Sequence, residues 1–154
     1  MAGFCQIQIP NYGLIVKPLY EVLKGLGSEP LGWSEECQLA FDTIKVKLTS
    51  APALGLPNLD KPFSLFVHER QGINLGVLVQ KLGTASRLVA YFSKQLDQMV
   101  KAWPPCLQAV AATCNILQEA EKFTLGQPTK VYGPTSPHIT GTERGILAYL
   151  RKNG

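Results

Sequence analysis

One histidine, His68, stands at the end of the apolar stretch PFSLFV that begins at Pro62. Imidazole titrates near neutral pH, so His68 has three interpretations: a general base or metal ligand, a phosphate contact, or a polar residue satisfied by a neighbour at a strand end. A general base needs a nucleophile or a second partner, and the sequence places neither beside His68. We favour the polar residue at a strand end and leave the other two interpretations open.

Carboxylates and thiols supply little other chemistry. Two-metal phosphodiester cleavage needs several converging carboxylates, and the chain has three aspartates, none of which is predicted to lie inside a strand: Asp42, Asp60 and Asp97. The cysteines at positions 5, 37, 106 and 114 lack C-x-x-C spacing. We therefore expect buried free thiols in a reducing compartment, no metal and no cofactor.

The net charge of +4 is compatible with nucleic acid but does not require it. Cationic side chains and one aromatic ring are candidates for a nucleic-acid-binding rim: Arg70, Lys81, Arg87, Lys94, Lys101 and Trp103. Trp103 precedes two prolines and could stack on a base, although such a ring more often packs at a helix entrance. Because the cations are scattered over separate elements, we favour ordinary surface charges.

Helical spacing dominates the first part of the chain. Apolar residues recur at helical intervals over Tyr12–Lys24, and a second helix should begin after Ser34, a good N-cap. Its predicted apolar face consists of Cys37, Ala40, Phe41, Ile44 and Leu48. The segment SAPALGLPNLDKP lacks periodicity and predicts a linker.

Alternation marks the second part, where short connections predict an antiparallel meander of strands at Phe63–Val67, Ile73–Gln80 and Arg87–Ser93. Within the second strand, Gly76 predicts a bulge or a close backbone approach. The prolines after Trp103 suit the first turn of a helix. The predicted buried stripe of that helix is Leu107, Val110, Ala111, Cys114 and Leu117.

A fourth strand, TKVY, should pair in parallel because a helix crosses over before it, and a last helix is predicted at Thr142–Arg151. The expected fold class is therefore α/β, in the order βββ-α-β-α after a small helical lobe. No apolar run is long enough to span a membrane, and the N-terminus does not resemble a signal peptide.

Several stretches carry a resemblance to a known family: APALGLP, KPFSLFV, QGINLGVLVQKLG, VAYFSKQLD, WPPCLQAVAA and TLGQP. In this order they resemble the connection domain of gammaretrovirus-type reverse transcriptases, and AGFCQIQIPNYG with WSEECQLAFDTIKVKLTSAP resembles the preceding end of the thumb. The resemblance covers residues 2–132. It implies a ribonuclease H-like fold for residues 58–154, preceded by a helical lobe at residues 1–57.

Nuclease members of this fold bind two divalent metals with carboxylates on the first strand, the following helix and the fourth strand. By motif, the resemblance places His68 at the first of these positions, Gln108 at the second, and Gly133 or Pro134 at the third. Imidazole and amide groups replace hard oxygen ligands poorly. We therefore expect a degenerate metal site and a chain that is not an enzyme.

The resulting hypothesis is a catalytically inactive domain of retroviral origin with a structural or protein-interaction role. The alternative is a connection module that still binds RNA/DNA hybrid. The family keeps an acidic residue where this chain has His68, which favours a domesticated host copy, such as a protein that also has NYN nuclease and retroviral integrase-like regions. Expected partners are other domains of a larger polyprotein or host protein, and weakly nucleic acid, but not a membrane. We expect an intracellular monomer. The family's fifth strand does not follow the last helix in this sequence, so either the sequence has been cut there or the sheet is one strand short.

Overall fold

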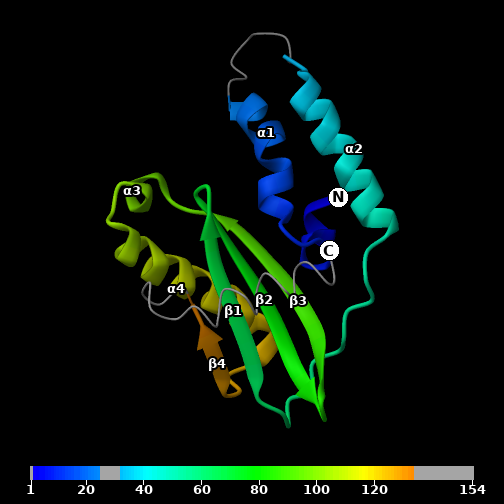
Figure 1. The fold of residues 1–154 in the computed structure, drawn as a ribbon, viewed down its shortest axis with the longest axis vertical. Helices are drawn as coiled ribbons and strands as arrows, with labels where there is room; N and C mark the ends of the chain where they lie inside the picture. The colour runs from blue at the N-terminus through cyan, green and yellow to red at the C-terminus, as the bar shows by residue number, and fades with distance from the viewer. Residues whose placement is uncertain (1, 25–31, 134–154) are drawn as a thin grey trace.

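The computed structural model describes residues 2–24 and 32–133. Figure 1 shows a lobe of two helices beyond one end of a twisted sheet, with a longer helix crossing one face of that sheet. The elements in chain order are η1 (Ala2–Gln8, a 3₁₀ helix), α1 (Tyr12–Lys24), α2 (Glu35–Thr49), β1 (Phe63–Arg70), β2 (Ile73–Leu82), β3 (Ala85–Gln95), α3 (Gln98–Lys101), α4 (Pro105–Thr124) and β4 (Thr129–Tyr132). The predicted helix at 142–151 lies outside the described residues, and so does the part of the chain that bears on the question of a fifth strand.

The sheet has the strand order β3-β2-β1-β4. Strand β2 pairs antiparallel with both β1 and β3, whereas β4 pairs parallel to β1, with Phe63 opposite Thr129. The parallel pairing follows from α4, which carries the chain back to the starting end of β1 before β4 begins. The mixed α/β class and the predicted topology are thus confirmed.

The main core lies between the sheet and α4. Alternate residues of β1 point into it, and α4 contributes Ala112, Ile116 and Ala120, spaced by four residues. Gly76 of β2 makes a close approach rather than a bulge, because a Cβ there would collide with Ile116. The predicted stripe of α4 is wrong at three positions: Leu107 and Val110 are 49% and 60% exposed, and Cys114 is exposed as well. Small side chains, which allow close approach, face the sheet instead.

In the lobe, α1 and α2 bury a second cluster that includes Tyr12, Val16 and Ile44. Ser34 caps α2 as predicted, since its hydroxyl accepts a hydrogen bond from the Cys37 N–H at 3.3 Å. The predicted apolar face of α2 is only partly correct. Cys37, Ala40 and Ile44 are buried, but Phe41 and Leu48 stay exposed.

The lobe packs directly on the sheet. The Gly13 N–H donates to Ser93 Oγ of β3 at 2.7 Å, and a Cβ at Gly13 would collide with that hydroxyl. The linker is tied down as well, because the buried Gln80 amide donates to the carbonyls of Asn58 and Lys61 at 2.7 and 3.1 Å. These hydrogen bonds anchor α1 to β3 at Ser93 and the linker to β2 at Gln80.

The prediction of buried thiols holds for Cys37 and is wrong for Cys106 and Cys114, which lie on exposed positions of α4. Among the described helices, none is long and apolar enough to cross a bilayer.

Candidate nucleic-acid interface

His68 lies near the end of β1, opposite Leu75 of β2. Strand alternation places its side chain on the face that bears Phe66, away from the Val67 face that α4 covers. It borders a shallow hollow shared with Leu75, Tyr91 and, from the lobe, Asn11. No carboxylate is among the described residues that line this hollow.

Gln108 is engaged elsewhere. Its side-chain amide donates to the backbone carbonyls of Lys101 and Trp103 at 3.0 and 2.7 Å, which fixes the junction between α3 and α4. The structure therefore does not bring His68 and Gln108 together on one face of the sheet. Gly133 follows β4 and lies beside Thr113 of α4, and Pro134 lies outside the described residues. Within the described part of the chain, no group of three His, Cys, Asp or Glu side chains could hold a metal ion.

Part of the predicted basic rim gathers around the β1–β2 turn. Arg70 ends β1, and the Lys101 side chain reaches over the turn, so that a Cβ on Gly72 would lie 2.9 Å from Lys101 Cε. Trp103 lies two residues after the end of α3 and is exposed. Glu69 also lies at this turn. Its carboxylate accepts a hydrogen bond from the Gly72 N–H at 2.7 Å and so stabilises the turn. We call Arg70, Lys101 and Trp103 the turn-end cluster.

The remaining cations lie apart from this cluster. Lys81 and Arg87 are at the opposite end of the sheet, beside the β2–β3 turn. Lys94 is ion-paired, with its Nζ 3.2 Å from Glu119 Oε1 on α4. Lys122, which also donates to Glu119, and then Lys94 hold the pKa of this carboxyl below its ordinary value.

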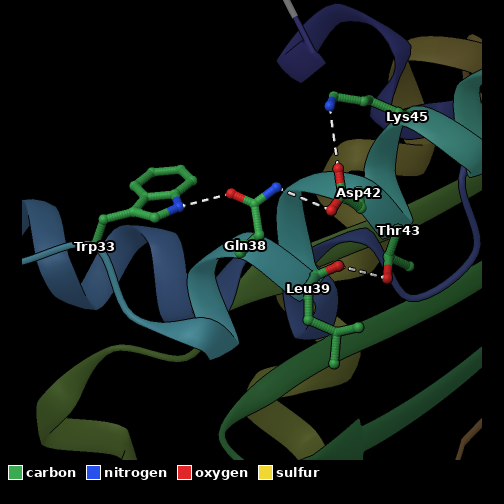
Figure 2. Close-up of polar contacts among 6 residues, drawn as sticks. All are labelled: Trp33, Gln38, Leu39, Asp42, Thr43 and Lys45. Atoms are coloured by element: carbon green, nitrogen blue, oxygen red, sulfur yellow. Dashed lines mark hydrogen bonds and ion pairs between the residues drawn. The ribbon is translucent and has the colours of Figure 1, made fainter.

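A polar network on α2, which the sequence analysis did not single out, is shown in Figure 2. The Trp33 indole N–H donates to Gln38 Oε1 at 2.9 Å, and the Gln38 amide donates to Asp42 at 2.9 Å. Lys45 Nζ lies 3.0 Å from Asp42 Oδ1 and 4.3 Å from the centroid of the Phe41 ring. The hydrogen bond from Gln38, followed by that from Lys45, lowers the pKa of Asp42. The sequence could have predicted the bonds within the helix. Gln38 and Asp42 are four residues apart and Asp42 and Lys45 are three apart, and these spacings bring helical side chains together.

The sequence analysis also did not predict the buried side-chain amide of Asn74 in β2. Asn74 is fully buried, and neither its Nδ2 nor its Oδ1 has a hydrogen-bond partner among the described residues. Such a group destabilises the fold by about 1–3 kcal/mol. Its only sequence signal is one polar letter inside the apolar run INLGVLV.

Comparison with known proteins identifies the class. A family model described as "RNase H-like domain found in reverse transcriptase" matches residues 33–131. The chain therefore belongs to the family of ribonuclease H-like domains of reverse transcriptases. The Gag-Pol polyprotein of Baboon endogenous virus (strain M7) is 52% identical over 86% of this chain and 8% of its own length. The Pol polyprotein of Feline endogenous virus ECE1 is 50% identical over 86% of this chain and 12% of its own length. This chain thus spans about a tenth of these relatives, and its retroviral resemblance is confirmed.

Solved structures share the fold. The foamy viral protease-reverse transcriptase in complex with double-stranded DNA aligns with a TM-score of 0.75 and 22% identity, over 97% of this chain and 28% of that one. A foamy viral protease-reverse transcriptase in complex with RNA/DNA hybrid aligns with a TM-score of 0.73 and 20% identity, over 98% of this chain and 20% of that one. These alignments include the lobe as well as the sheet.

The prediction that the chain is not an enzyme is contradicted by these relatives, which are Gag-Pol and Pol polyproteins with a ribonuclease H-like domain, an enzymatic family. That prediction weighed the residue types at a few positions. Family membership rests on the match over residues 33–131, and the residue types at those few positions do not decide it.

Proposed function

We propose that this chain is the connection segment of a reverse transcriptase polyprotein and that it holds duplex nucleic acid, with RNA/DNA hybrid as the preferred ligand. Family membership over residues 33–131 is the observation that carries the proposal. The complexes of foamy viral protease-reverse transcriptase with DNA and with hybrid support the choice of ligand. The division into a lobe at 1–57 and a connection domain at 58–154 belongs to the same proposal.

The turn-end cluster is the proposed contact surface. Arg70 and Lys101 would meet backbone phosphates, and the exposed Trp103 ring would stack on a base or lie against a sugar. Lys94 lies apart from the cluster, and its charge is partly neutralised by Glu119. The proposed surface would therefore recognise the charged backbone of the nucleic acid rather than its base sequence.

The test is a titration of labelled RNA/DNA hybrid across salt concentrations. Arg70→Ala/Lys101→Ala should weaken binding about tenfold and reduce the salt slope by about 2, because each lost phosphate contact removes close to one unit. Lys81→Ala/Arg87→Ala is the matched control, since it removes the same charge at the other end of the sheet. Equal losses in both variants would leave only general electrostatic attraction, and no binding at low salt would end the proposal.

We also propose that the chain is a domesticated host copy, in the manner of a host protein with NYN nuclease and integrase-like regions. Support comes from His68, which the resemblance places where the family keeps an acidic residue, and from relatives that are endogenous viruses. Recovery of the coding sequence with host flanking DNA from uninfected tissue is the expected result. An intracellular, monomeric state belongs to this proposal, supported by the unpaired cysteines at positions 5, 37, 106 and 114.

A structural role, in which the segment joins neighbouring domains, is the second candidate. It is favoured by exposed apolar side chains on α2, among them Leu39 and Val46.

A further inference from the structure

The outer face of the sheet, opposite α4, carries aromatic and basic side chains on β1 and β4, the two strands that Figure 1 shows at one edge of the sheet. Phe66 lies opposite Tyr132 in the parallel pair. Their rings stack, with centroids 4.8 Å apart and an angle of 16° between the planes. Strand alternation places further side chains on the same face. We call the resulting set the outer row: Phe66, His68, Arg70, Lys130 and Tyr132.

The two rings of the outer row form a fixed platform that reaches solvent. Tyr132 is 38% exposed although Phe66 covers one side of its ring. Phe66 in turn packs against a buried cluster of β2 and β3, which holds the pair in place. Beside the rings, His68 borders the shallow hollow that Asn11 of the lobe also lines. A flat ligand can therefore lie against Tyr132 with polar groups nearby.

The sheet also has an uneven distribution of charge. Within the four described strands Glu69 is the one carboxylate, and alternation turns it to the α4 side, where it bonds the Gly72 N–H. Arg70 and Lys130 are exposed, and neither is ion-paired with a described residue, Asp60 of the nearby linker included. The outer row therefore keeps its positive charge, which complements phosphate groups.

We propose that the outer row binds single-stranded nucleic acid, with an unpaired base stacked on Tyr132 and with phosphates at Lys130 and Arg70. The inference deepens the proposed function and rests on it in one respect. Arg70 also belongs to the turn-end cluster, so a strand on the outer row would continue from a duplex held at the turn.

The rings decide the class of ligand. Every base has a π face that can stack on an aromatic side chain, but in a duplex these faces are covered by the neighbouring base pairs. A platform of rings on a sheet can therefore stack on the bases of an unpaired strand. A purely apolar protein surface fits less well, because it would bury Arg70 and Lys130 without supplying a counter-charge.

Titration of two labelled probes with the 154-residue chain tests the proposal. The probes are oligo(dT) of about 12 nucleotides, within the range of known single-strand sites, and a blunt RNA/DNA hybrid of the same length. Tyr132→Ala should weaken oligo(dT) binding about tenfold through lost stacking and leave hybrid binding unchanged. Tyr132→Phe keeps the ring and should bind like the parent chain. Val131→Ala is the matched control, because Val131 is also 38% exposed on β4 but points to the other face.

Two further variants separate the cation and the ring from general effects on folding. Lys130→Ala should reduce the slope of log affinity for oligo(dT) against log salt by about 0.7, the loss for one phosphate contact on a single strand. Tyr132→Leu keeps an apolar side chain against Phe66 but has no ring. It should therefore lose oligo(dT) binding as Tyr132→Ala does, while its circular dichroism spectrum matches that of the parent chain.

Equal oligo(dT) affinity in the parent chain and Tyr132→Ala, or an equal loss in Val131→Ala, would overturn the proposal. An equal loss of hybrid binding in Tyr132→Ala would assign the ring to the duplex surface and overturn it too. No binding of oligo(dT) at low salt would leave the outer row to a protein or to the following segment of the chain; hybrid binding that depends on Arg70 and Lys101 would then leave the proposed function intact. Binding of oligo(dT) that depends on Tyr132, without hybrid binding, would instead count against the proposed function alone.

Discussion

Helices α2 and α4 both carry apolar residues around most of their circumference, yet they use them differently. Helix α4 lies across a sheet and buries small residues, with Ile116 seated over Gly76. Helix α2 meets a single helix, α1, and buries a narrow line that ends at Ile44, leaving Leu39 and Val46 outside. A broad flat partner selects side chains that allow close approach. A cylindrical partner covers less of the helix and leaves apolar side chains exposed to solvent.

The largest test of this comparison removes the central isoleucine of each helix. Ile116→Ala should cost about 3–5 kcal/mol in the free energy of unfolding, because the sheet and α4 cannot collapse around the cavity. Ile44→Ala should cost about 2 kcal/mol, since α1 and α2 can close up on each other. Urea denaturation of both variants measures the difference. If Ile44→Ala proves at least as costly as Ile116→Ala, the contrast between the two helices is wrong.

Gly76 tests the closeness of α4 directly. Gly76→Ala introduces a Cβ that meets Ile116 Cγ2, so it should destabilise the fold by about 1–3 kcal/mol through overpacking. Gly32→Ala, just before α2, has nothing within 4 Å of the added Cβ and should be neutral. Thermal unfolding followed by circular dichroism compares the two. A neutral Gly76→Ala would show that α4 shifts freely on the sheet.

Most elements could be predicted from the sequence, although η1 and α3 were not, whereas the buried faces of the helices could not. Alternation marks β1, short connections mark the meander of β1–β3, and the prolines before Cys106 mark the start of α4. Helical spacing, however, indicates that an apolar stripe exists without saying which one is buried. In α4 the larger side chains Leu107 and Val110 fit the helical spacing, but the structure buries Ala112 and Ile116 instead. Gly76 leaves the room that Ile116 occupies. Nor could spacing group Arg70 with Lys101, since their proximity depends on how α3 settles over the β1–β2 turn.

A third test compares two buried amides of β2. Asn74→Leu removes an amide whose atoms have no hydrogen-bond partner among the described residues, so it should stabilise the fold by about 1–2 kcal/mol. Gln80→Met is the matched control, because the Gln80 amide bonds the linker at Asn58 and Lys61 and its loss should destabilise by a similar amount. Opposite shifts of the melting temperature are expected. A destabilised Asn74→Leu would indicate that Asn74 has a bound partner, such as a buried water.

The smallest effect concerns acid stability, and it again separates α4 from α2. Glu119 bonds Lys122 and Lys94, and its pKa in the folded chain is lowered. A lowered folded-state pKa means that the carboxylate stabilises the fold above its unfolded pKa, and that this contribution is lost as pH falls through the folded pKa. Glu119→Gln should therefore lose a few tenths of a kcal/mol at pH 7, as exposed ion pairs do, and match the parent chain at the acid end. Asp42→Asn on α2 removes a carboxylate whose pKa is lowered as well, so its deficit should depend on pH in the same direction but be smaller, because Asp42 is fully exposed and water screens its partners. Denaturation midpoints measured from neutral to acid pH decide the matter, because a Glu119→Gln deficit that persists in acid cannot come from the ion pairs.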